Sequence, residues 1–172
     1  TKNPNKYYRA SSAGHCFKKH WYAINGYEVG DMNDKSRRLL RLGTIVHRDI
    51  EKAVNWHEDR LACNIDNEYN VSFKTEYEVL IKDLKVMGSA DIVLIDSEKT
   101  ASVLDVKTTH SWKWKMMFGH NKEIKPSRMY ELQLGTYGMG VSLQEDISHE
   151  DMSLFLVYYK KDDSSMKYVN VN

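Results

Sequence analysis

Cysteine, proline and long apolar runs are all scarce in this chain of 172 residues. The two cysteines, Cys16 and Cys63, are too few for a disulfide framework or a complete cysteine metal cage, so we expect a reducing, intracellular setting. No apolar run approaches the roughly 20 residues of a membrane span, and no signal-peptide pattern opens the chain, which predicts no association with a membrane. These absences argue against the secreted and membrane-spanning classes.

The length fits a single domain, residues 1–172, that is long enough to bury a hydrophobic core. Apolar residues make up 41% and charged residues 28%, as in ordinary globular proteins. The chain starts at Thr1 and ends in a strand-like run, "MKYVNVN", which is typical of a domain trimmed at one or both ends.

The net charge of +1 conceals an uneven distribution. Residues 1–27 hold five Lys or Arg and no acidic residue, whereas residues 28–105 hold eleven Lys or Arg against sixteen Asp or Glu. Residues 106–128 are basic again, with six Lys or Arg against Glu123. Basic flanks around an acidic centre fit an enzyme that holds a polyanion beside a metal site, although a solvated surface produces the same pattern.

Hydrophobic periodicity predicts a first helix from Asp34 to about Arg60, with an apolar face of Leu39, Leu42, Val46, Ile50, Ala53 and Val54. Three strand-like runs follow: "NVSFKTEYEVLI", "KVMGSADIVLID" and "TASVLDVKTT". The turn-like segment 96–100 separates the last two, so we expect a hairpin. In the first run, alternation predicts one shared face for Val71, Phe73, Thr75, Tyr77, Val79 and Ile81.

Two more helices and a hairpin complete the predicted elements. The second helix starts near Ser111, which we expect to cap it, and the third follows Pro126 and Ser127 and ends near Leu143. "MSLFLVYYKK" and "MKYVNVN", joined by "DDSS", predict a terminal hairpin. This order of elements predicts an α/β or α+β sandwich with a mixed central sheet, and of the two we expect an α/β fold with helices flanking the sheet.

One run, "SVLDVKTT", places a carboxylate and an ammonium two residues apart. Because alternate residues of a strand share a face, Asp105 and Lys107 point the same way. The expected hairpin brings Asp91 of the preceding strand beside them. Two carboxylates in an apolar setting repel each other unless a cation joins them, and Mg²⁺ or Mn²⁺ suits such oxygen ligands. The alternative is a solvated strand face with a weak ion pair.

Further polar residues have two interpretations each. His47 in "GTIVH" lies beside the apolar stripe of the first helix and is either a ligand or an ordinary surface histidine. Gln133 and Tyr137 in "QLGTY" are four residues apart and therefore share a helix face. Glu76 or Glu78 is either an outer carboxylate of the site or part of a solvated strand face.

The order of "GTIVH", "GSAD", "DVKTT" and "QLGTY" resembles the PD-(D/E)XK nuclease superfamily, in its RecB-like exonuclease branch. The resemblance covers roughly residues 11–160 and implies a restriction-endonuclease-like core. It implies metal ligation by His47, Asp91, Asp105 and the backbone carbonyl of Val106, catalysis by Lys107, and positioning of the lysine or the DNA backbone by Gln133 and Tyr137.

The chain departs from the family pattern in two places. Ala90 stands where the family name has a proline. Many relatives bind a 4Fe–4S cluster through one early and three late cysteines; Cys16 fits the early position, but no late cysteine exists. We therefore expect no iron–sulfur cluster, Cys16 packed as a small hydrophobic residue and Cys63 in the loop after the first helix. The alternative is that a C-terminal segment was removed.

Basic and aromatic residues predict DNA contacts. In "SWKWK", Trp112 would stack on unpaired bases while Lys113 and Lys115 meet phosphates, although at least one tryptophan of this segment is expected in the core. Lys18 and Lys19 are further candidates on charge alone.

The resemblance implies a Mg²⁺- or Mn²⁺-dependent exonuclease that hydrolyses DNA phosphodiester bonds on single strands or at DNA ends, in the cytoplasm of a bacterial or phage-infected cell. Three alternatives stay open: a structure-selective endonuclease, a DNA-binding module without catalysis, and an adaptor domain of a recombination or CRISPR complex. The adaptor would need a partner to act. A protein partner or a homo-oligomer stays open for the other interpretations as well.

Overall fold

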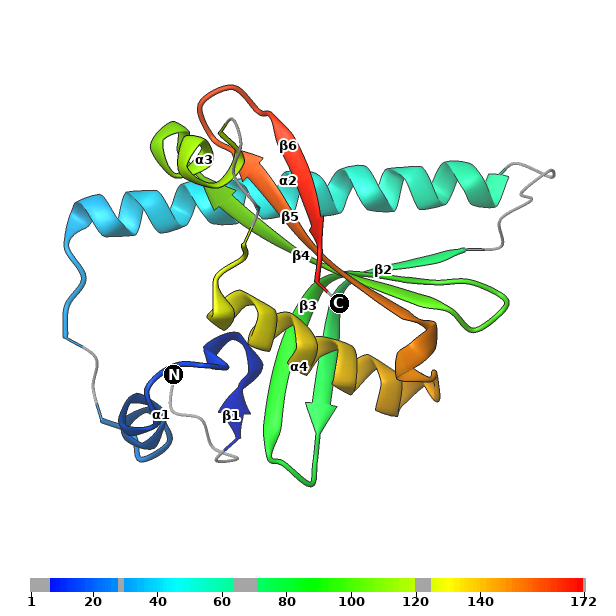
Figure 1. Ribbon diagram of the computed structural model, residues 1–172, viewed down its shortest axis with the longest axis horizontal. Coiled ribbons are helices and arrows are strands. Elements are labelled where there is room, and N and C mark those ends of the chain that lie inside the picture. Colours follow the sequence, from blue (N-terminus) through cyan, green and yellow to red (C-terminus); the bar gives the residue numbers. More distant parts are fainter. Residues whose placement is uncertain (1–6, 28–29, 64–70, 120–124, 172) are drawn as a thin grey trace.

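Six strands form one mixed sheet with helices on both faces (Figure 1). The computed structural model describes residues 7–27, 30–63, 71–119 and 125–171, with the backbone alone for residues 59–63. No helix in this described part is long and apolar enough to cross a membrane. The elements are β1 (Tyr8–Arg9), α1 (Phe17–Ile24), α2 (Asp34–Cys63), β2 (Ser72–Ile81), β3 (Val86–Ile95), β4 (Ala101–Thr109), α3 (Ser111–Phe118), α4 (Arg128–Glu145), β5 (Met152–Lys160) and β6 (Met166–Asn170), with 3₁₀ turns at Ala10–Ser12 and His149–Asp151.

The strand order confirms an α/β fold with a mixed sheet. The sheet runs β1-β3-β4-β5-β6, and β2 pairs with β3. Both predicted hairpins are present, since β3 pairs antiparallel with β4 and β5 pairs antiparallel with β6. Strands β4 and β5 run parallel along their whole length, and α3 and α4 lie in the crossover between them.

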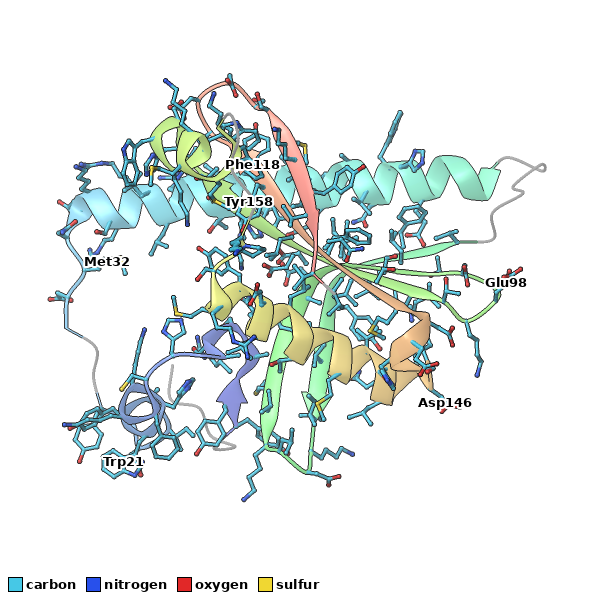
Figure 2. The ribbon with its side chains drawn as sticks, in the orientation of Figure 1. Trp21, Met32, Glu98, Phe118, Asp146 and Tyr158 are labelled. Atoms are coloured by element: carbon cyan, nitrogen blue, oxygen red, sulfur yellow. The ribbon has the colours of Figure 1, made fainter. Side chains whose placement is uncertain are left out.

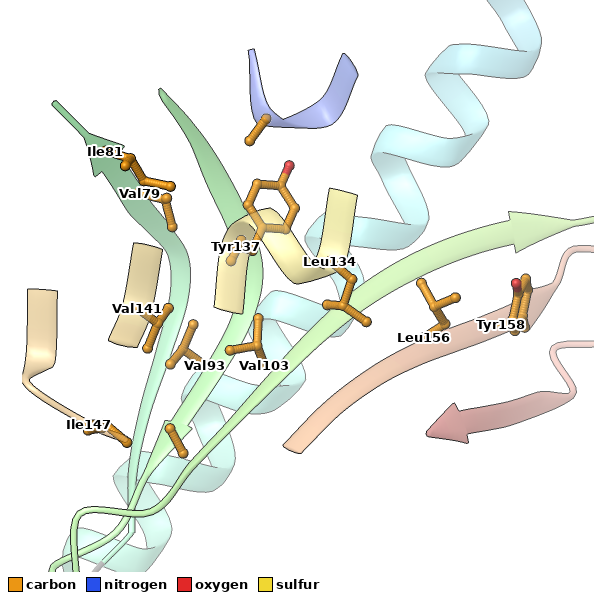
Figure 3. Close-up of a cluster of buried hydrophobic side chains, with 13 residues drawn as sticks. Val79, Ile81, Val93, Val103, Leu134, Tyr137, Val141, Ile147, Leu156 and Tyr158 are labelled. Carbon is orange, nitrogen blue, oxygen red and sulfur yellow. The ribbon is translucent and has the colours of Figure 1, made fainter. Parts of the chain in front are cut away.

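The two faces of the sheet carry separate apolar cores. On one face, Leu134, Tyr137 and Val141 of α4 point toward the strands and pack with valines of β2, β3 and β4 (Figure 3). On the other face, Ile50 and Val54 of α2 pack against Ile92, Val106 and Val157. Burial of this kind stabilises a domain by about 25 cal/mol for each Å² of apolar surface.

Strands β3 and β4 separate partway along the sheet. They are paired from Ile92 to Ile95 of β3, and beyond Ile92 the β2–β3 hairpin bends away from β4 (Figure 1). At the point of separation, the Asp91 carboxylate takes a hydrogen bond from the Val106 backbone N–H, with Oδ2 2.6 Å from the nitrogen. We call this point the fork; it is defined by Asp91 and Val106.

The prediction of one shared face along β2 is wrong. Phe73 packs edge-on against His57 of α2, and the Thr75 hydroxyl donates to Asn55 of the same helix. Tyr77 instead donates to Glu145 at the end of α4. The face changes at Glu76, whose φ of 48° breaks the alternation of an extended strand.

Strand β3 changes face at the matching position. Ala90 and Val93 both belong to the core under α4, whereas Ile92 belongs to the core under α2. Asp91 contacts His47 of α2 and therefore lies on the α2 side of the sheet, together with Ile92. This change of face sets the direction in which Asp91, one of the predicted metal ligands, points.

The N-terminal segment adds elements that the periodicity did not predict, namely β1, a 3₁₀ turn and α1. Cys16 precedes α1 and is exposed, so the prediction that it packs as a small hydrophobic residue is wrong. Cys63 is the last residue of α2 rather than part of a loop. The cap of α3 is His110, whose Nδ1 accepts from the Lys113 backbone N–H, and not Ser111.

Helix α4 lies so close to β2 that one added methyl group at Gly140 would change the stability of the folded chain. A Cβ added at Gly140 would overlap the Val79 side chain, whereas one at Gly135 meets nothing within 4 Å. We expect Gly140→Ala to lower the free energy of unfolding by about 1–2 kcal/mol through overpacking. Gly135→Ala should raise it by up to about 1 kcal/mol through helix propensity. Urea unfolding checks both, and equal effects of the two changes would contradict this packing.

Candidate functional site

The side chain of Asp105 is buried at the fork, on the α4 side of β4. Its relative exposure is 1%, and its Oδ1 accepts a hydrogen bond from Gln133 Nε2 at 3.1 Å. Lys107 Nζ lies 2.6 Å from the other oxygen, Oδ2, so the two side chains form an ion pair. Two other buried side-chain oxygens of the described residues, Thr109 Oγ1 and Tyr158 Oη, have no hydrogen-bond partner.

Helix α4 holds the ammonium of Lys107 in place. Gln133 Oε1 accepts from Lys107 Nζ at 3.1 Å, and the Tyr130 ring centroid lies 4.8 Å from the same nitrogen. Gln133 Nε2 also donates to Tyr137 Oη at 3.1 Å. One amide therefore contacts both Asp105 and Lys107. The shared face predicted for Gln133 and Tyr137 is confirmed.

Helix α2 contributes His47 from the opposite face of the sheet. His47 Nδ1 lies 3.4 Å from Asp91 Oδ1, while Asp91 Oδ2 accepts from the Val106 backbone. The hydrogen bond to Asp91 raises the pKa of His47, and partial burial of the imidazole opposes that rise. Helix α2 places its histidine toward the fork because the apolar stripe beside it packs on the sheet.

The electrostatics of the site are dominated by Asp105. Burial raises the pKa of its carboxyl, the charge of Lys107 opposes that rise and the charge of Asp91 adds to it, so that the pKa is about 6. The site thus combines two carboxylates with one ammonium and one imidazole. A carboxyl group with this pKa is poorly stabilised as an anion and would gain from a further cation.

A cavity of about 650 Å³ opens beside these residues. Glu51 of α2 and Glu76 of β2 line it, and Glu76 accepts a hydrogen bond from Ser89 Oγ at 2.7 Å. Burial and a hydrogen bond with Glu76 raise the pKa of Glu51. Besides Glu51 and Glu76, the lining consists of Leu39, Leu40, Gly43, Thr44, His47, Arg48, Val106, Lys107, Thr108 and Tyr130.

Sequence reasoning missed several residues of this cavity. Tyr130 contacts Lys107 and lies three residues before Gln133, a spacing that places both on one side of α4. Arg48 directly follows His47. Leu39 was assigned to the apolar face of its helix, but it lines the cavity and is half exposed.

The carboxylates and the imidazole of the site are side chains that bind divalent cations, but here they contact one another and Lys107. Among the described residues, no three His, Cys, Asp or Glu side chains are placed to share one metal ion. Asp91 contacts His47, and Asp105 contacts Lys107 instead. Carboxylate and imidazole ligands fit Mn²⁺, and carboxylates fit Mg²⁺. The residues therefore fit such an ion by their chemistry but not by their present arrangement.

The segment after β4 divides between core and surface. Trp114 packs against Phe118, which lies edge-on to Tyr158 of β5 (Figure 2). Trp112 is 68% exposed and stacks on His110. At least one tryptophan of this segment thus packs in the core, as expected.

The predicted DNA-contact lysines lie in two places. Lys113 Nζ is 5.2 Å from the Tyr130 ring centroid, so it borders the cavity, and Lys115 is exposed on the same helix. Lys18 lies over the Tyr22 ring and Lys19 Nζ is 3.3 Å from His15 Nδ1, both within the α1 region. Neither of these two lysines lines the cavity.

Comparison with known proteins shows the fold alone. No protein-family model and no curated protein matches the chain. Among solved structures, the chain is similar to SSO0001, with a TM-score of 0.59 and 18% sequence identity. That similarity covers 100% of this chain and 69% of SSO0001. At this identity the match supports the α/β architecture and assigns no activity.

Replacing Asp105 with Asn should change the pH dependence of stability. The folded chain holds this proton more tightly than the unfolded chain, with a pKa of about 6 against an ordinary 3.8. The free energy of unfolding of the wild type therefore falls as pH rises through that interval, by up to about 3 kcal/mol. Asp105→Asn lacks this fall and should be roughly 1–3 kcal/mol more stable at neutral pH.

Urea unfolding in EDTA at a series of pH values measures this difference. Asp146→Asn is the matched control, because the Asp146 side chain is fully exposed and its left-handed backbone suits asparagine. Parallel stability curves for the wild type and Asp105→Asn would contradict the raised pKa.

Proposed function

We propose that the chain is a metal-dependent DNA nuclease of the PD-(D/E)XK type, in the RecB-like branch. It would hydrolyse phosphodiester bonds on single strands or at DNA ends, in the cytoplasm of a bacterial or phage-infected cell. The observation that carries this proposal is the buried Asp105 carboxylate, which pairs with the Lys107 ammonium at 2.6 Å and lies near a second carboxylate, Asp91, at the fork. A buried ion pair adds little to stability by itself, so a functional role for these charged groups is the better explanation of their burial.

In this proposal, Asp91, Asp105, His47 and the Val106 carbonyl would hold Mg²⁺ or Mn²⁺. A bound ion of this kind supplies a Lewis acid and an acidified water for attack on phosphorus. Gln133 keeps the Lys107 ammonium at the site through its 3.1 Å hydrogen bond. Lys107 would neutralise a phosphate oxygen as negative charge develops there, which is the usual task of a fixed cation in such a reaction.

The charge pattern around the cavity supports a polyanionic substrate. Lys107 and Arg48 line the cavity, and Lys113 borders it beside Tyr130. These cations would hold phosphates next to a carboxylate pair that by itself repels them. The exposed Trp112 and Lys115 would extend the contact, and Lys18 and Lys19 would add a second, remote contact through α1.

Nuclease activity on end-labelled single- and double-stranded DNA tests the proposal directly. We expect degradation with Mn²⁺ or Mg²⁺ and none in EDTA. Lys107→Ala should lower kcat/KM about 100- to 1,000-fold, because the fixed charge is lost. Lys99→Ala, in the exposed turn before β4, should leave the rate unchanged. DNA that is bound but intact with both metals would contradict the proposal.

Metal binding has a readout that needs no substrate. Because an ion that binds only the folded state stabilises it, saturating Mn²⁺ should raise the melting temperature of the wild type by roughly 5–10 °C. Asp91→Asn and Asp105→Asn should lose most of this increase. The exposed-carboxylate control Asp146→Asn should keep it. An equal increase in all four proteins would place the ion elsewhere.

A further inference from the structure

The cavity beside Lys107 changes character along helix α2. Leu39, Leu40 and Gly43 line it near the start of the helix, whereas His47 and Glu51 line it later. At a rise of 1.5 Å per residue, the eleven steps along the helix from Leu40 to Glu51 span roughly 16 Å. We call the part lined by Leu39, Leu40 and Gly43 the apolar end. It is separate from the carboxylates but belongs to the same cavity.

The two leucines of the apolar end are not part of the core. Leu39 is 50% exposed and Leu40 is 60% exposed, although both are large apolar side chains. The first part of α2 extends past the edge of the sheet (Figure 1). Apolar surface at a cavity wall beside cationic groups is typical of a ligand site rather than of packing.

Gly43 lines this end without a side chain. A Cβ added there would make an ordinary van der Waals contact with Thr108 Oγ1 of β4, at 3.5 Å, so helix and strand lie close to each other here. Tyr130 lines the same cavity, and the ammonium groups of both Lys107 and Lys113 lie over its ring. An aromatic ring and two leucines thus adjoin the cations that would hold phosphates.

We propose that the apolar end takes an unpaired nucleobase of the strand that is cut. This inference rests on the proposed nuclease function and specifies its substrate. A nucleotide joins an anionic phosphate to a flat, weakly polar base, and the cavity joins cations to an apolar wall in the same way. A paired base inside a duplex is stacked on both sides and cannot enter without extrusion, which costs a few kcal/mol. The site would therefore take single strands and frayed ends, not intact duplex.

The test compares a variant of the apolar end with a matched control in the same helix. The double variant Leu39→Ser, Leu40→Ser changes only half-exposed side chains, so folding should persist. Leu42→Ser is the control, because Leu42 is 42% exposed but does not line the cavity. Affinity is measured by fluorescence polarisation with Ca²⁺, for a labelled thymidine oligonucleotide and for the same oligonucleotide with abasic residues.

We expect the double variant to bind the thymidine oligonucleotide about 10-fold or more weakly than the wild type, and Leu42→Ser to bind it normally. All three proteins should bind the abasic oligonucleotide equally. An equal loss on both oligonucleotides, or no difference between the double variant and Leu42→Ser, would overturn the base site.

Cleavage of the thymidine oligonucleotide with Mn²⁺ separates this result from the nuclease proposal. If the wild type cleaves DNA while the double variant binds and cleaves as well as Leu42→Ser, the base site alone fails. If the wild type shows base-dependent binding that the leucines control but does not cleave, the nuclease proposal alone fails. Absence of any DNA binding by the wild type overturns both.

Discussion

The hydrogen bond from the Val106 backbone to the Asp91 carboxylate is the interaction on which the rest of the site depends. Strands β3 and β4 separate at this point, and a backbone N–H that loses its partner inside a protein costs about 1–3 kcal/mol. The Asp91 side chain supplies the missing acceptor. One oxygen is thereby committed to the fold, and the other is left to face His47. The carboxylate that closes the fork is thus also the one that points into the site.

The fork explains how helices on opposite faces of a sheet reach one place. Asp91 faces α2, whereas Asp105 faces α4, so an unbroken sheet would keep their partners apart. Where β3 bends away, no strand separates the two sides, and His47 and Gln133 approach the same pair of strands. The Asp91 hydrogen bond raises the pKa of His47, and the charges of Asp105 and Lys107 also reach its imidazole, in opposite directions.

Sequence patterns predicted the parts of the structure that follow regular periodicity. Asp105 and Lys107 share a face as alternation requires, and Gln133 contacts Tyr137 at helical spacing. The face change at Glu76 was not predictable, because a non-glycine residue at positive φ leaves no mark in the sequence. For the same reason, the residues alone placed Asp91 near Asp105 but did not indicate that it faces α2. The contribution of Tyr130 depends on how α4 docks, which is a property of the tertiary packing.

The buried carboxyl group of Asp105 lowers the stability of the folded chain, which calls for a physical reason for its presence at the fork. A buried carboxyl group with a raised pKa destabilises the folded chain at neutral pH, and one ammonium beside it does not remove that penalty. Replacement by an apolar side chain would relieve it. Retaining Asp105 is reasonable where a cation of higher charge is to be bound, since the unfavourable anion is then the source of affinity. In the structure, Lys107 neutralises part of this charge, and Gln133 holds the pair together, because its amide accepts from the ammonium and donates to the carboxylate.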